Sequence, residues 1–220
     1  MIPAAFDYVR AESPDHALEL LAEHGDEAKL LAGGHSLIPL MKYRLAAPGV
    51  IVDIGRLAEL SYIRDEGDHL AIGALTRHRD VETSDLVAAQ AGLLADATHH
   101  VGDPQVRHRG TIGGSIAHGD PASDIPSALL ALRATMVVRG ADGTREVAAD
   151  DFFTGFLETA VGETELLTEI RVPKVPGARW SFQKFNRRAQ DWAIVGASVL
   201  VADGDVGIGL VNMDSRPIRA

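Results

Sequence analysis

Two glycine pairs, each set between apolar runs, constrain the fold of this chain more than any other feature. Residues 29–38 read KLLAGGHSLI and residues 109–117 read RGTIGGSIA, so a hydroxyl side chain lies close to each pair. Glycine lets the backbone adopt positive φ and approach a ligand closely. Free N–H groups in such a turn, or at a helix N-terminus behind it, attract anions. The two turns are therefore either a site for the two phosphates of a dinucleotide or a pair of tight structural turns in a chain with 22 glycines.

Composition limits the classes of function. The 220 residues suit one large domain or two small ones, and 46% of them are hydrophobic, which is enough for a core. A formal net charge of −10 argues against nucleic acid or an anionic membrane surface as the main partner. No apolar run reaches the ~18 residues of a membrane span. The first residues lack the basic start and apolar core of a signal peptide, which predicts a cytoplasmic location.

The chain contains no cysteine. This excludes a disulfide, a thiol nucleophile and a cysteine-held iron–sulfur cluster within these residues. Redox chemistry here would need a bound organic cofactor or a metal site made of histidines and carboxylates.

The first part of the chain predicts a small β-α-β-turn-α-β unit. Strands are expected at residues 6–9, 29–32 and 50–54. Ser13 and Pro14 are typical of a helix start, and Gly25 is typical of a helix stop. A second helix is expected over residues 37–45, with Ser36 as its N-cap.

The middle of the chain mixes strands and helices. The expected strands are residues 61–64 and 69–72 as a hairpin, 135–138 and 145–147 as a pair, and 166–172. One helix is expected over residues 86–99, and another over residues 125–132 with Ser123 as its cap. Thr111 offers a hydroxyl beside the second glycine turn.

Residues 173–177, PKVPG, indicate a boundary. Three further strands are expected at residues 180–185, 193–201 and 206–212. A three-stranded sheet needs something against its apolar face, and no helix follows before residue 220. We therefore expect this last segment to be truncated or completed by a partner chain.

Other chemical interpretations fit the residues less well. Asp53 lies about 20 positions after Gly33, as in a nicotinamide-binding domain, but the first turn lacks the spacing and the third glycine of G-x-G-x-x-G. The nine histidines include His99 and His100, which are adjacent, and none shows a tight metal-ligand spacing. No G-x-S-x-G elbow indicates a serine hydrolase.

Four motifs together resemble a known family. They are AGGHSLIP at residues 32–39, DPQVR at 103–107, RGTIGGS at 109–115 and GDPASDIP at 119–126. In this order they resemble the FAD-binding medium subunits of molybdenum hydroxylases, the carbon monoxide dehydrogenase and xanthine dehydrogenase family. The similarity covers nearly the whole chain.

The resemblance implies an α+β fold. This is the two-subdomain FAD-binding fold of the vanillyl-alcohol-oxidase type, followed by a small α+β C-terminal domain. The expected division is residues 1–55 for the first FAD-binding subdomain, 56–175 for the second, and 178–220 for the start of the C-terminal domain.

The same resemblance implies a set of cofactor-binding residues and no catalytic or metal-binding ones. Ala32 to Ser36 would wrap the FAD pyrophosphate, and Thr111 to Ser115 would form a second clasp. Asp124 would bind the nucleotide end, whereas Leu167 and Lys184 would line the flavin. Trp192 replaces a family tyrosine near the isoalloxazine ring and can stack there, the alternative being a half-buried tryptophan beside a strand. The full set is Ala32, Gly33, Gly34, His35, Ser36, Leu37, Thr111, Gly113, Gly114, Ser115, Asp124, Leu167, Lys184 and Trp192.

The implied function is an electron relay. Molybdopterin and 2Fe–2S clusters are expected on a large and a small partner subunit, in a dimer of heterotrimers that is cytoplasmic or held at a membrane through the complex. FAD on this chain would pass electrons to an external acceptor. Two alternatives stay open: a free-standing FAD oxidase or reductase, in which His35 could bond covalently to the flavin, and a scaffold subunit without cofactor. Neither the substrate nor the acceptor follows from the sequence.

Overall fold

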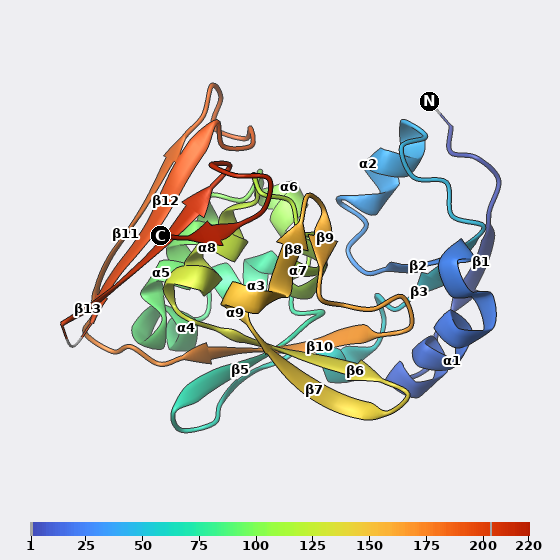
Figure 1. The fold of residues 1–220 in the computed structure, drawn as a ribbon, viewed down its shortest axis with the longest axis horizontal. Coiled ribbons are helices and arrows are strands. Elements are labelled where there is room, and N and C mark those ends of the chain that lie inside the picture. The colour runs from blue at the N-terminus through green and yellow to red at the C-terminus, as the bar shows by residue number, and fades with distance from the viewer. Residues whose placement is uncertain (1, 203) are drawn as a thin grey trace.

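Three larger β-sheets, each built from a separate stretch of the chain, frame the molecule in a computed structural model that describes residues 2–202 and 204–220 (Figure 1). A fourth sheet has only two short strands. The first sheet lies at one end with the N-terminal helices, the third lies at the other end, and the second runs below the helices between them. Each sheet falls within one of the three segments expected from the sequence, but the division into domains stays a prediction.

The first sheet is parallel, with order β1-β3-β2. Its strands are β1 (Asp7–Arg10), β2 (Ala28–Leu31) and β3 (Val50–Asp53). Helix α1 (Pro14–His24) begins where Ser13 Oγ accepts a hydrogen bond from the His16 N–H at 3.1 Å, and it ends at Gly25 with φ +53°. Both ends agree with the sequence prediction. The 3-10 turn η1 (Gly25–Glu27) then leads into β2.

Helix α2 (Leu37–Lys42) follows the first glycine turn and is shorter than predicted. It stops before residue 45 because Arg44 adopts φ +58°, outside the helical region. Ser36 occupies the N-cap position, but its side chain makes no capping hydrogen bond, so the predicted cap is wrong.

The second sheet is antiparallel, with order β4-β5-β10-β6-β7. Its strands are β4 (Ile63–Asp65), β5 (His69–Gly73), β6 (Thr135–Gly140), β7 (Gly143–Ala148) and β10 (Leu166–Pro173). The chain before and between these strands also contains four short elements: η2 (Ala58–Leu60), α9 (Ala149–Phe152), β8 (Phe153–Gly155) and β9 (Glu158–Thr159). Strands β8 and β9 pair with each other. The hairpin and the paired strands expected from the sequence are present.

Six helices lie between the second and third sheets, and the main hydrophobic core lies among them. They are α3 (His78–Glu82), α4 (Asp85–Gln90), α5 (Gly92–His99), α6 (Pro104–Arg107), α7 (Ile112–His118) and α8 (Asp124–Ala131). The single helix predicted over residues 86–99 is instead α4 and α5, which part at Ala91 (φ −147°). The indole of Trp180 packs against Gly92, where a Cβ would lie only 2.7 Å from its Nε1.

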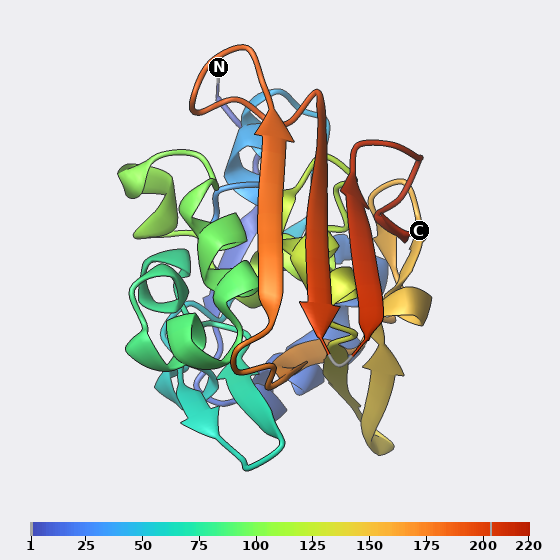
Figure 2. The ribbon, with the colours of Figure 1, turned by 90° about the vertical axis from the view of Figure 1, so that its left-hand side faces the viewer.

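The third sheet has order β11-β12-β13-β14 and is antiparallel (Figure 2). Its strands are β11 (Arg179–Phe185), β12 (Val195–Ala202), β13 (Asp205–Val211) and β14 (Ile218–Arg219). Helix α8 covers one face: a Cβ on Gly209 would lie 1.9 Å from the Ser127 carbonyl, and Ser198 Oγ hydrogen-bonds Ser127 Oγ at 2.7 Å. The expectation that this face lacks a cover within the chain is therefore wrong.

In the part of the chain that the structure describes, no helix is long and apolar enough to cross a membrane. The predicted location in the cell stays a prediction.

Candidate functional site

A cavity of about 680 Å³ lies between the first sheet, the two glycine turns and the loop that joins β11 to β12. This volume is within the range of small-molecule and cofactor sites. All fourteen residues expected from the sequence lie in its lining: Ala32, Gly33, Gly34, His35, Ser36, Leu37, Thr111, Gly113, Gly114, Ser115, Asp124, Leu167, Lys184 and Trp192. The structure thus brings together residues that are up to 160 positions apart, from Ala32 to Trp192.

The two glycine turns contact each other directly. A Cβ on Gly33 would lie 2.3 Å from the carbonyl oxygen of Arg109 and 2.9 Å from the Cα of Gly110. Only glycine allows this approach, because both neighbours are backbone atoms that cannot turn aside. The turns therefore form one wall of the cavity rather than two separate features.

The first turn has free hydrogen-bond donors. Gly34 has φ +77°, and its carbonyl accepts from the Ile38 N–H at 3.1 Å, which begins α2. Over residues 2–202 and 204–220, no protein acceptor pairs with the backbone N–H of Gly34, His35 or Ser36. His35 is exposed, and its Nδ1 lies 3.1 Å from the Gly33 carbonyl oxygen. Free donors beside a cavity suit an anionic ligand.

In the second turn, the three consecutive amides of Gly113, Gly114 and Ser115 are paired within the chain. The Gly113 N–H donates to the Ala74 carbonyl at 2.8 Å, the Gly114 N–H to Thr111 Oγ1 at 3.2 Å, and the Ser115 N–H to the Thr111 carbonyl at 3.0 Å. Thr111 is the N-cap of α7. These three amides are therefore not available to a phosphate in this structure, and the predicted part of the turn in holding a cofactor stays a prediction.

Asp124 and Lys184 form a buried ion pair at the cavity wall. Lys184 Nζ donates to Asp124 Oδ2 at 2.8 Å and to the His100 carbonyl at 3.0 Å. Asp124 is 5% exposed, and burial raises its pKa to about 6 although Lys184 opposes this shift. Its other oxygen, Oδ1, has no partner among the described residues.

This ion pair joins two of the expected cofactor-binding residues. The resemblance implies that Asp124 binds the nucleotide end of the cofactor and that Lys184 lines the flavin. The sequence does not indicate that the two side chains form an ion pair at 2.8 Å, and their separate roles toward a cofactor stay a prediction.

Two further residues border the cavity in different ways. Leu167 is buried in β10, at a register shift between Leu167 and Glu169. Trp192 lies in the loop between β11 and β12 and is 71% exposed, so the alternative of a half-buried structural tryptophan is wrong. Arg188 holds this loop through an ion pair with Asp191 at 3.0 Å. The indole is free to lie against a ligand.

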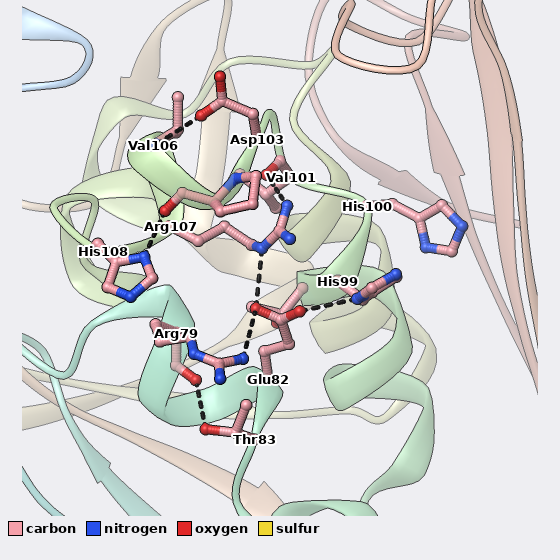
Figure 3. A network of polar contacts seen from close by, with 12 residues as sticks. Arg79, Glu82, Thr83, His99, His100, Val101, Asp103, Val106, Arg107 and His108 are labelled. Atoms are coloured by element: carbon pink, nitrogen blue, oxygen red, sulfur yellow. Dashed lines mark hydrogen bonds and ion pairs between the residues drawn. The ribbon is translucent and has the colours of Figure 1, made fainter.

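A charged network supports the segment that leads into the second turn (Figure 3). Glu82 accepts from Arg107 Nε at 2.8 Å and from His99 Nδ1 at 2.7 Å, and Arg107 also donates to the Val101 carbonyl at 3.0 Å. Burial disfavours the ionised form of Glu82, but the hydrogen bonds from His99 and Arg107 outweigh it and lower its pKa. Asp103 caps α6 by accepting from the Val106 N–H at 2.9 Å. The DPQVR motif thus fixes a loop rather than supplying a reactive group.

His78 is a cavity-lining residue that the sequence did not predict. No pattern in a single sequence separates it from the other eight histidines. Nor does any group of three or more histidine or carboxylate side chains capable of holding a metal ion occur among the described residues.

Comparison with known proteins decides the family. The model of the FAD binding domain in molybdopterin dehydrogenase matches residues 4–175. The chain belongs to this family. It is 46% identical to the carbon monoxide dehydrogenase medium chain of Hydrogenophaga pseudoflava, covering 100% of this chain and 78% of the relative. It is 42% identical to the glyceraldehyde dehydrogenase medium chain of Sulfolobus acidocaldarius, covering 100% and 80%.

Solved structures support the same family assignment. Carbon monoxide dehydrogenase from Hydrogenophaga pseudoflava superposes with a TM-score of 0.97 at 44% identity, covering all of this chain and 78% of that one. Quinoline 2-oxidoreductase from Pseudomonas putida 86 gives a TM-score of 0.93 at 32% identity, again over all of this chain and 78% of that one. The predicted family and the α+β fold are confirmed, and the chain is an FAD-binding component of an oxidoreductase.

Proposed function

We propose that this chain holds FAD in the cavity between the glycine turns and passes electrons from iron–sulfur clusters of a partner subunit to an external acceptor. The observation that carries the proposal is a cavity of cofactor size, in a chain of an FAD-binding family, whose wall presents free backbone donors at the first glycine turn. Bound FAD supplies a carrier that accepts electrons one at a time and releases them in pairs.

In this proposal, the residues of this chain bind the cofactor and orient it. The free N–H groups of Gly34, His35 and Ser36 suit the anionic diphosphate. Asp124 Oδ1, buried and without a partner, is an acceptor for hydroxyl groups of the cofactor. Trp192 offers an aromatic face at the edge of the cavity. The relay needs no side chain that transfers protons, and none is assigned.

The relatives are medium chains and subunits, so this chain is one component of a multi-subunit enzyme. We propose a small iron–sulfur subunit and a large molybdenum subunit as its partners, in a dimer of heterotrimers. The relatives' names include carbon monoxide, glyceraldehyde and caffeine dehydrogenases. Because these subunits share one fold while the named substrates differ, we propose that substrate choice resides in the large subunit.

An absorption spectrum of the purified chain, before and after acid precipitation, tests the proposal. Flavin bands that move into the supernatant as FAD are the expected result. Flavin that stays in the pellet would indicate a covalent bond, with His35 the first candidate, and would favour a free-standing oxidase. A chain that holds no FAD, alone or reassembled with its partners, would contradict the proposal and favour a scaffold.

A further inference from the structure

His78 is a buried histidine that takes part in none of the ion pairs described above. It is 4% exposed and lines the cavity, and it is the first residue of α3. Its backbone N–H donates to the Gly110 carbonyl at 3.0 Å, which joins α3 to the second turn.

The imidazole lies where the two glycine turns meet. A Cβ on Gly110 would lie 2.6 Å from Cδ2 and 2.9 Å from Nε2 of His78, so this edge of the ring packs on Gly110. Gly110 in turn contacts Gly33 of the first turn, at 2.9 Å from its Cα to a Cβ built there. Gly110 thus contacts both the ring and the first turn, and His78, Gly110 and Gly33 all line the cavity.

The ring has unused hydrogen-bonding capacity. A neutral imidazole carries one N–H donor and one acceptor, yet neither nitrogen of His78 has a partner in the described part of the chain. Nδ1 is fully buried, whereas Nε2 is not among the fully buried atoms without a partner and lies beside the cavity-lining Gly110. Nε2 is therefore the nitrogen that can reach a ligand.

The charges around the ring favour an anion. Burial, followed by the charges of His35, Arg107 and Arg77, lowers the pKa of His78 to about 4. The ring is therefore neutral at pH 7, and the permanent positive charges of Arg77 and Arg107 act on it. Burial and the charge of Arg109 lower the pKa of Arg77, and the carboxylates of Asp80 and Asp53 oppose this shift. A neutral donor within a cationic surrounding is suited to a phosphate oxygen.

We propose that His78 is a further cofactor-binding residue, whose Nε2–H donates a hydrogen bond to the diphosphate of the bound dinucleotide at the junction of the two glycine turns. The inference rests on the proposed binding of FAD. It supplies a donor on the side of the second turn, where the amides of Gly113 and Gly114 are already paired within the chain.

The test compares FAD with riboflavin, which has no phosphate, by titrating the flavin-free chain and following flavin fluorescence. His78→Phe keeps a flat ring and removes both nitrogens, and His78→Gln keeps an N–H donor. His69→Phe is the matched control, because His69 lies on β5 and does not line the cavity. We expect His78→Phe to weaken FAD binding by about tenfold, His78→Gln to recover part of it, and riboflavin binding to stay unchanged in all variants.

Unchanged FAD affinity in His78→Phe would overturn the inference, and so would an equal loss of FAD and riboflavin, which would indicate packing alone. If His78→Phe does not fold, the ¹⁵N resonances of the His78 ring in the wild-type chain provide the test instead. Their ¹⁵N resonances should shift when FAD is added and not when riboflavin is added, and the absence of a shift would overturn the inference. If the wild-type chain binds no FAD, the proposed function itself is contradicted. That result is distinguishable from every outcome for the His78 variants.

Discussion

The two glycine turns look alike in the sequence and differ in how they use glycine. In the first, Gly34 adopts φ +77° and the amides of Gly34, His35 and Ser36 are free. In the second, Gly113 packs on Ala74, with 2.5 Å between the Ala74 Cβ and a Cβ built on Gly113, and its N–H is paired with the Ala74 carbonyl. One turn leaves its donors unpaired, whereas the other uses its glycines to let two segments of the chain pack closely.

The difference shows what a Gly-Gly motif can and cannot predict. It predicts close backbone approach in both places, but whether the approaching group is a ligand or the protein itself depends on residues far away in the sequence, such as Ala74. Changes that affect one turn and leave the other intact can therefore separate binding from packing.

The largest expected effect is on the support of the second turn. Glu82→Ala leaves Arg107 buried without its carboxylate, since each side chain is only 9% exposed. Removing one partner of a buried pair costs about 3–5 kcal/mol, which urea denaturation would measure as a lower free energy of unfolding. Glu146→Ala is the control, because Glu146 is exposed in its pair with Arg171 and its loss should change little. Equal effects of the two substitutions would contradict a supporting role for Glu82.

Gly113→Ala comes next. The new methyl would lie 2.6 Å from the Ala74 carbonyl oxygen, a backbone atom, so overpacking should lower the free energy of unfolding by about 1–3 kcal/mol. Gly140→Ala is the matched control, because the nearest atom there is 3.3 Å away in the flexible side chain of Glu165. A variant with unchanged stability and no FAD binding would break the comparison, because Gly113 would then serve the ligand.

The charge state of His78 gives a pH-dependent prediction. Its folded pKa of about 4 lies below the ordinary histidine value, so the unfolded chain takes up the proton first and stability falls as pH falls from about 6.5 toward 4. Between pH 7 and pH 5, protonation of this group in the unfolded chain should lower the free energy of unfolding by about 2 kcal/mol. The difference between wild type and His78→Phe, by denaturation at both pH values, isolates it.

Asp124 contributes with the opposite sign and is present in both of those proteins. Its folded pKa, about 6, lies above its ordinary value, so protonation favours the folded state as pH falls. Equal pH slopes for wild type and His78→Phe would mean that His78 is not held neutral by the fold.

The smallest effect on stability is expected at the first turn. Gly34→Ala places a side chain at φ +77°, which costs about 1 kcal/mol. Gly67→Ala is matched to it, because Gly67 has φ +93°, open space around it and no part in the cavity. Similar losses in stability are expected, with weaker FAD binding only in Gly34→Ala, measured by fluorescence titration. Weaker FAD binding in both variants would mean that general destabilisation is responsible.

Much of the fold follows from local sequence patterns. Ser13, Pro14 and Gly25 define α1 as predicted, and the alternation of Gly207 and Gly209 in β13 is itself a signal of close backbone approach. The sequence did not indicate which element makes that approach, because α8 is about 80 residues earlier in the chain.

The sequence places the candidate residues together but does not show their pairing. Eleven of the fourteen lie in the four motifs, the family resemblance adds Leu167, Lys184 and Trp192, and all fourteen line one cavity. The motifs do not reveal that Asp124 pairs with Lys184, 60 positions away, or that His78 packs on Gly110. Both contacts form only when α3, α8 and β11 assemble around the turns, so tertiary structure rather than local sequence decides them.

The central claim is that the first turn binds the cofactor through its amides and that the amides of Gly113 and Gly114 in the second turn do not. Backbone ¹H–¹⁵N spectra of the chain with and without FAD test it directly. The amides of Gly34, His35 and Ser36 should shift strongly and become protected from hydrogen exchange, whereas those of Gly113 and Gly114 should keep the protection that their bonds within the chain already give. Strong shifts and new protection confined to Gly113 and Gly114, with residues 34–36 unchanged, would contradict the account.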